Sequence, residues 1–123
     1  MTLLGNVDYA DLPALYAEND VFVTPSMSET FGHPIIEAMA AATPVIASDT
    51  PVHREVCGES AVFFPGLSVD ALVDAIKMLD RDPQCRKRIL DEASTLIERD
   101  YSWEGHVDRL LENLETVAQA NIR

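Results

Sequence analysis

The sequence predicts an α/β fold with about three to four parallel strands, flanking helices and a helical C-terminal tail. Three short apolar runs, Val21–Thr24, Val45–Ala47 and Ala61–Phe64, are typical of strands buried in a parallel sheet. A segment with helical features separates each run from the next. Proline, glycine or Ser-Asp-Thr-Pro turn chemistry stops each run, so the alternation of strand and helix is sharply punctuated.

The individual elements follow from local patterns. Thr2–Leu4, ahead of Gly5, is expected to form a short strand or the end of one. Asp11 and Pro13 suit the first turn of a short helix over Asp11–Ala17. Further helices are expected at 34–42, 51–56, 69–80 and from 82 onward. A last helix from Trp103, which frays after Gln119, carries an apolar stripe of Val107, Leu110, Leu111, Leu114, Val117 and Ala118.

Composition and charge restrict the function. The 123 residues suffice for one domain, and 47% of them are apolar. The net charge of −12 argues against binding to a nucleic-acid backbone or an anionic lipid surface. No run is apolar enough for a transmembrane segment, and no signal peptide is recognised. Cys57 and Cys85 read as reduced thiols of a cytoplasmic protein, and the three histidines lack the spacing of a zinc site.

The chemistry concentrates in Ser26–Pro44, where Glu29 and Glu37 lie eight positions apart around the start of a helix. Gly32 permits close approach of the backbone to a ligand, and Pro34 suits a first helical turn. The free N–H groups there attract an anion, while the carboxylates need hydroxyl groups to bind. A nucleotide sugar offers both. The alternative is a solvated Glu29 and a Glu37 that merely interacts with the helix dipole.

The segments SETFGHPIIEAMA, which contains E-x7-E, and TPVIASDTPVHREV resemble the signature of a known enzyme family. The family is that of the retaining, nucleotide-sugar-dependent glycosyltransferases of family 4, or group 1, which have the GT-B fold. LPALYAENDVFVTP, GESAVFFP and the helical tail extend the resemblance over nearly the whole chain. The resemblance implies a partial Rossmann-like domain that belongs to the donor-binding, C-terminal part of such an enzyme.

The resemblance also implies residue roles. Glu29, as the catalytic-site residue, would hydrogen-bond the donor sugar near its reacting carbon. Glu37 would bind both ribose hydroxyls. No cofactor or metal is expected, since the nucleotide sugar is a substrate. The sequence departs from the usual family pattern at position 30, where glycine is common, and at 41–42, where Cys-Gly is common. The donor-binding backbone amides would come from Thr30, Phe31, Gly32 and His33.

In the resembling family, residues 1–123 would form the second half of the donor-binding domain. The acceptor domain and the first half of the donor domain would be absent, so the isolated chain is expected to be inactive. Its partners would be a nucleotide-diphosphate sugar and the missing half of the parent protein. Val21–Thr24 would become an apolar sheet edge and favour a homodimer. Two alternatives remain open: a self-associating fragment without activity, and a flavodoxin-like small-molecule binding module.

Overall fold

A computed structural model describes residues 1–120 of the chain and shows a three-stranded parallel sheet. The strands are β1 (Phe22–Thr24), β2 (Val45–Ser48) and β3 (Ala61–Phe64), and their order in the sheet is β1-β2-β3. Val45 of β2 is aligned with Phe22 of β1 and with Ala61 of β3. The predicted α/β class is therefore confirmed, with three strands.

The helices begin where the sequence supplies proline or a capping side chain. Proline occupies the first turn of four helices, where its missing N–H costs no hydrogen bond. Ser68 and Asp82 each accept hydrogen bonds from backbone N–H groups one turn ahead. The elements are η1 (Tyr9–Asp11), α1 (Leu12–Ala17), α2 (His33–Ala40), α3 (Pro51–Cys57), α4 (Val69–Arg81), α5 (Pro83–Leu96), η2 (Ile97–Tyr101, a π-helix) and α6 (Trp103–Ala120).

The core lies on both faces of the sheet, with β2 as the central and fully buried strand. Val45 and Ala47 point to the face covered by α2, α3 and α5. Ile46 points to the opposite face, where it packs with residues of β3, α4 and α5. This alternation follows from the two-residue period of a strand. It explains why the run is apolar without interruption, because both faces are buried.

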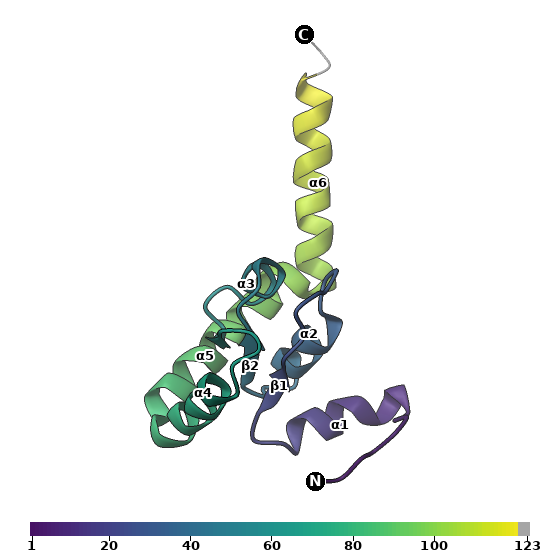
Figure 1. Ribbon diagram of the computed structural model, residues 1–123. Helices are drawn as coiled ribbons and strands as arrows, with labels where there is room; N and C mark the ends of the chain where they lie inside the picture. The colour runs from purple at the N-terminus through teal and green to yellow at the C-terminus, as the bar shows by residue number, and fades with distance from the viewer. Residues whose placement is uncertain (121–123) are drawn as a thin grey trace.

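Two local expectations are wrong. Thr2–Leu4 forms no strand, and its large side chains are exposed. A strand needs a hydrogen-bonded neighbour, and this segment lies beside α1 instead of the sheet (Figure 1). The helix expected to reach Ala42 ends at Ala40, since Ala42 adopts a left-handed conformation with φ 56°. The short loop after α2 therefore depends on a conformation that favours glycine.

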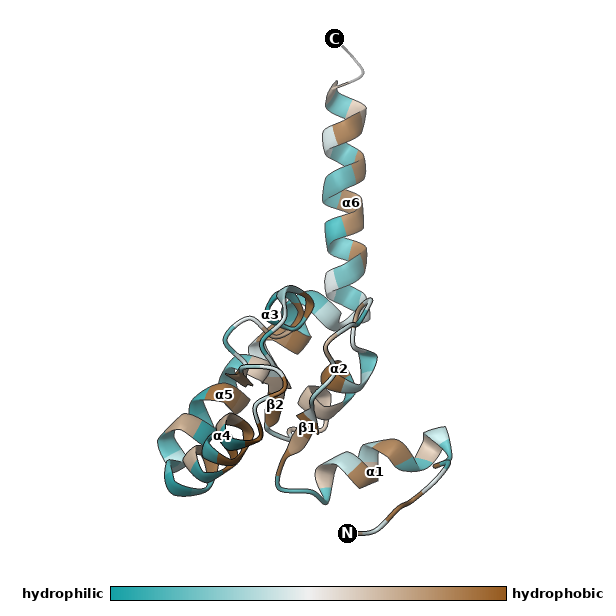
Figure 2. Cartoon of the chain, in the orientation of Figure 1, coloured by the Kyte–Doolittle hydropathy of each residue, from teal (hydrophilic) through white to brown (hydrophobic). Residues whose placement is uncertain are grey.

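Helix α6 differs from the other long helices because it projects away from the body of the protein (Figure 1). None of its described residues is buried, and it contacts the rest of the chain chiefly through η2. Brown, hydrophobic residues recur along it in Figure 2. It was expected to fray after Gln119; the helix includes Ala120, and residues 121–123 lie outside those described.

Candidate donor-binding site

The loop from Pro25 to Gly32 leaves the carboxyl end of β1 and enters α2. The loops after β2 and β3 begin at the same edge, because all three strands are parallel. The end of β2 and the loop after β3 hold the first loop in place: the hydroxyl of Ser48, the last residue of β2, donates to the Ser26 carbonyl, and the Met27 side chain lies against Gly66. Ligands of open parallel sheets bind at this edge.

Gly32 sets the transition from the loop to α2. Its φ of 87° and ψ of 47° are left-handed, and a Cβ there would lie 3.2 Å from Cδ1 of Ile35. A side chain at this position would therefore be strained as well as crowded. No side chain caps the start of α2, so the N–H groups there are not bonded by a capping residue. That these groups attract an anion stays a prediction.

The side chains of the loop are mostly exposed. Glu29 and Thr30 are exposed, as is His33 at the start of α2. Phe31 stands edge-on to the His33 ring, with centroids 5.0 Å apart, and to the Tyr101 ring at 6.1 Å. Tyr101 belongs to η2 and donates to the carbonyl oxygen of Val56 at 3.1 Å. The loop thus packs against the junction between α5 and α6, a contact that no local pattern indicated.

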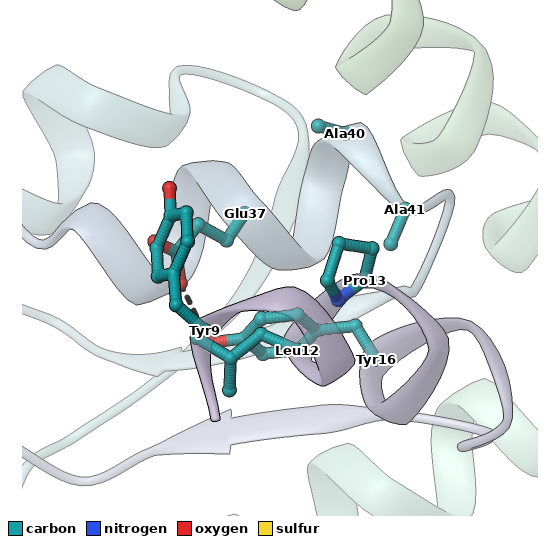
Figure 3. A pocket seen from close by; sticks show the side chains of 7 residues that line it. All are labelled: Tyr9, Leu12, Pro13, Tyr16, Glu37, Ala40 and Ala41. Atoms are coloured by element: carbon teal, nitrogen blue, oxygen red, sulfur yellow. Dashed lines mark hydrogen bonds between the residues drawn. The ribbon is translucent and has the colours of Figure 1, made fainter. Parts of the chain in front are cut away.

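Glu37 is in a different environment from Glu29. Its side chain is half-buried between α1 and α2, and its Oε2 accepts a hydrogen bond of 3.0 Å from the Tyr16 hydroxyl (Figure 3). Burial and the adjacent Glu37 carboxylate raise the pKa of Tyr16 to about 12. Tyr16 therefore stays protonated and remains a hydrogen-bond donor over the whole physiological range. Sequence reasoning did not identify this partner.

A cavity of about 230 Å³ lies beside the Glu37 carboxylate. Its wall is predominantly apolar and aromatic, with Glu37 as its charged residue. In Figure 3 the Tyr9 ring stands next to the Glu37 side chain, and Tyr16 approaches the carboxylate from below. Glu29 is not among the lining residues, which are Tyr9, Leu12, Pro13, Tyr16, Glu37, Ala40 and Ala41. Most of these residues come from the segment before β1, in which the sequence predicted a short helix over Asp11–Ala17 and no site residue.

A buried polar pair lies under the loop. Nδ1 of His53 is 2.8 Å from the carbonyl oxygen of Ser48 and 3.1 Å from its hydroxyl, and both residues are fully buried. Nε2 of His53 has no hydrogen-bond partner among the described residues. Because a carbonyl oxygen can only accept, Nδ1 carries the proton that is donated to Ser48. This pair fixes the Ser48 hydroxyl that bonds the loop.

The remaining candidate groups are less suited to chemistry. Burial raises the pKa of the Cys57 thiol to about 12, so it stays a protonated thiol, and neither Cys57 nor Cys85 forms a disulfide. Residues 1–120 contain no group of three or more side chains arranged to hold a metal ion. In the same part of the chain, no helix has both the length and the apolar character needed to cross a membrane.

Comparison with known proteins identifies relatives. The family model of the glycosyl transferases group 1 matches residues 1–95. A phosphatidyl-myo-inositol mannosyltransferase of Mycobacterium leprae is 36% identical over 118 residues, which cover 94% of this chain and 31% of that protein. An O-antigen chain mannosyltransferase of Salmonella typhimurium is 39% identical over 88 residues, which cover 72% and 25% of the two chains.

Solved structures agree with these sequence matches. The sucrose-phosphate synthase of Thermosynechococcus elongatus superposes with a TM-score of 0.79 at 28% identity, over 97% of this chain and 30% of that one. The C-terminal domain of a group 1 glycosyl transferase from Francisella tularensis gives a TM-score of 0.70 at 29% identity, over 81% and 53%. The chain spans 31% and 25% of the two mannosyltransferases described above. By fold and by sequence, this chain belongs to the group 1 glycosyl transferases.

Proposed function

We propose that the chain supplies part of the donor site of a retaining glycosyltransferase and binds a nucleotide-diphosphate sugar. The observation that carries the proposal is the placement of Glu37, half-buried and hydrogen-bonded at the wall of an apolar cavity. A carboxylate in such a setting suits the hydroxyls of a ribose, and the aromatic and aliphatic wall suits the flat face of a base. Family membership supplies the reaction class.

In this proposal the loop between β1 and α2 binds the sugar and the diphosphate. The exposed Glu29 accepts hydrogen bonds from sugar hydroxyls near the reacting carbon, and is the catalytic-site residue. The left-handed Gly32 supports the proposal because it lets the backbone turn its N–H groups toward a ligand. The diphosphate is bound, and stabilised as it leaves, by N–H groups of Thr30, Phe31, Gly32 and His33.

The charges near the loop explain why the isolated chain should bind its donor weakly. Arg54, in the last turn of α3, donates to both carboxylate oxygens of Asp49 at 2.6 and 2.8 Å. It also lies 4.5 Å from the centroid of the Phe63 ring. This cation is therefore already engaged, and the loop itself contains no basic residue. The diphosphate charge would have to be balanced by residues from elsewhere in a longer protein.

The proposal is tested by titrating the chain with GDP, UDP and ADP in turn and monitoring the backbone amide signals by NMR. We expect shifts at residues 25–37 with at least one nucleotide, and a loss of binding in Glu37→Ala. Glu115→Ala, which removes an exposed carboxylate from α6, is the matched control and should bind normally. Unchanged binding by Glu37→Ala would refute the placement of the ribose.

A transfer assay tests the other half of the proposal. With a radiolabelled nucleotide sugar, the 123-residue chain alone should show no turnover, because it spans 31% of the Mycobacterium leprae mannosyltransferase and its loop at residues 25–32 carries no basic residue. Transfer by this chain alone would contradict the proposal that it is only part of a donor site. A cytoplasmic location, where two free thiols stay reduced, belongs to the same proposal.

A second candidate role is self-association through β1. This strand is the open edge of the described sheet, and an apolar hollow of about 320 Å³ lies beside it. The N–H of Phe22 bonds the carbonyl of Pro44 in the loop before β2, so strand alternation turns the N–H of Val23 toward the open edge. We propose that a second copy pairs there as a two-fold dimer.

Light scattering tests this role. The chain should be dimeric at high micromolar concentration, and Val23→Pro should make it monomeric, because proline removes the outward N–H while the bonds to β2 remain. Circular dichroism would check that the variant keeps its fold. A strictly monomeric wild-type chain would refute the dimer.

A further inference from the structure

We propose that Tyr16 is a positioning residue that holds the Glu37 carboxylate in the orientation needed to bind the ribose hydroxyls of a nucleoside diphosphate. This inference rests on the proposed donor-binding function. It assigns a role to a side chain that lies outside the E-x7-E motif, 21 residues before Glu37 in the chain.

Tyr16 is itself anchored through both its ring and its backbone. Its ring stands edge-on to Phe22 of β1, with centroids 5.6 Å apart and an interplanar angle of 79°. Its backbone carbonyl accepts a hydrogen bond of 2.8 Å from the buried hydroxyl of Thr43, just before β2. The phenol is therefore fixed relative to the sheet, and a group bonded to it is fixed as well.

The Glu37 carboxylate must be oriented to bind a diol. An ionised Glu can accept about four hydrogen bonds, and binding two adjacent hydroxyls requires both carboxylate oxygens to face the two hydroxyls at once. The Tyr16 hydroxyl occupies one acceptor direction on Oε2 and restricts rotation of the carboxylate. Oε1 and the second acceptor direction of Oε2 remain for a ligand. Glu37 has thus lost part of its rotamer entropy before the ligand binds. Less entropy is lost on binding, and the affinity is higher.

The hydrogen bond between Tyr16 and Glu37 lies at the wall of the cavity. Tyr16 and Glu37 both line the cavity of about 230 Å³ between α1 and α2, and Figure 3 shows the bond at its wall. The phenol keeps its proton far above neutral pH, because burial and Glu37 raise its pKa to about 12. The donor is therefore present at every pH at which the protein would work.

The test compares each nucleotide with its 2′-deoxy form, so that the ligand hydroxyl and the Tyr16 hydroxyl are removed in turn. The wild-type chain should bind GDP, or whichever of GDP, UDP and ADP it binds, about tenfold more tightly than the 2′-deoxy form. Tyr16→Phe should lose about tenfold in affinity for the nucleotide and less than twofold for the deoxy form. NMR titration measures both affinities and also reports whether the variant is folded.

Thr43→Val is the matched structural control. It removes one hydrogen bond to the Tyr16 backbone carbonyl, which still accepts from the N–H of Asn19 at 3.0 Å, and it leaves the phenol hydroxyl in place. Because this second bond and the ring contact with Phe22 keep Tyr16 anchored, we expect Thr43→Val to weaken both ligands equally or neither. If Tyr16→Phe does not fold, Tyr16→Met lacks the hydroxyl but keeps an apolar wall, and the same split is expected.

Two different failures can be told apart. If the wild-type chain prefers the nucleotide to its deoxy form but Tyr16→Phe weakens both equally or neither, the positioning role is wrong and the ribose site stands. If the wild-type chain shows no such preference, or binds no nucleotide, the proposed ribose site fails and the role of Tyr16 fails with it. A further check is Glu37→Gln, in which adding Tyr16→Phe should have no further effect on the preference.

Discussion

Helices α2 and α6 are both amphipathic, yet the apolar face of α2 is buried and that of α6 is exposed. In α2 the apolar residues Ile35, Ala38 and Met39 are buried against the sheet. In α6 the apolar stripe predicted from the sequence stays largely exposed, with Leu110, Leu111, Leu114 and Val117 between 50 and 58% exposed. The apolar pattern of a helix therefore indicates which face can be buried. Whether that face is buried depends on whether another part of the chain packs against it.

The difference has a topological cause. Helix α2 connects two adjacent parallel strands, β1 and β2, along the chain. Both of its ends are therefore held at the sheet. Helix α6 is attached at one end only. Ser102 caps its start by accepting from the N–H of Gly105 at 3.0 Å, and Arg109 donates to Asp100 of η2 at 2.6 Å. Beyond these first turns, nothing in the described chain covers it.

The largest effect should come from the sheet. Ile46→Ala removes a fully buried side chain from the central strand, and should lower the free energy of unfolding by about 2–5 kcal/mol. Leu114→Ala removes a similar side chain from exposed α6, and should cost no more than about 0.5 kcal/mol. Urea denaturation followed by fluorescence measures both. Equal losses would show that the stripe on α6 is covered in solution.

The next effect concerns the attachment of α6. Replacing glycine by alanine inside a helix usually stabilises it by about 0.5–1 kcal/mol. At Gly105 the opposite is expected, because a Cβ there would clash with the backbone oxygen of Arg99. We expect Gly105→Ala to cost about 1–3 kcal/mol at the junction, as overpacking does. Amide exchange in α6 should rise while exchange in β2 is unchanged; a stabilised α6 would contradict this.

A smaller effect, of opposite sign, is expected at the end of α2. Ala42 has a φ of 56°, a conformation that costs an L-residue roughly 1–2 kcal/mol. Ala42→Gly should stabilise the protein by about 0.5–1 kcal/mol, since part of the gain is offset by the more flexible unfolded chain. Thermal denaturation provides the measurement. Ala38→Gly, inside α2, is the control and should destabilise, because glycine is unfavourable in a helix interior. A loss of stability in Ala42→Gly would disprove strain at this loop.

The smallest effect should depend on pH. The guanidinium of Arg99, followed by that of Arg109, keeps the pKa of Asp100 below its ordinary value of 3.8. A lowered pKa stabilises the folded state above the unfolded pKa, and this contribution disappears as the pH falls through the folded pKa. At pH 7, Asp100→Asn should loosen α6 by no more than about 0.5 kcal/mol. Relaxation of α6 amides should differ between variant and wild type at pH 7 and converge in acid; a difference that persists in acid would exclude the ion pairs as its cause.

Sequence reasoning identified β2, β3 and the helices around them because their signals are local. A continuous apolar run, a proline in a first turn or a capping Ser68 acts within a few residues. Thr2–Leu4 shows the limit of such signals. The same short apolar run is compatible with a strand, but strand formation depends on a hydrogen-bonding neighbour that this segment does not have.

The candidate site shows the same division. Glu29, Gly32 and Glu37 could be singled out because their spacing and their position at a helix start carry chemical meaning. The partners that distinguish the two carboxylates could not, because Tyr16 and Tyr101 come from elements distant in the chain. No local pattern shows that Tyr16 bonds Glu37, or that Phe31 packs on Tyr101.

The sequence by itself determined the α/β class, the order of strands and helices, and the stretch in which the two glutamates lie. Only the tertiary structure decided that Glu29 is exposed while Glu37 is held by Tyr16, and that the stripe of α6 has no cover among the described residues. The physical reason is that strand and helix formation depend on short-range sterics and hydrophobic period. Burial, orientation and partnership depend on which distant surfaces the chain brings together.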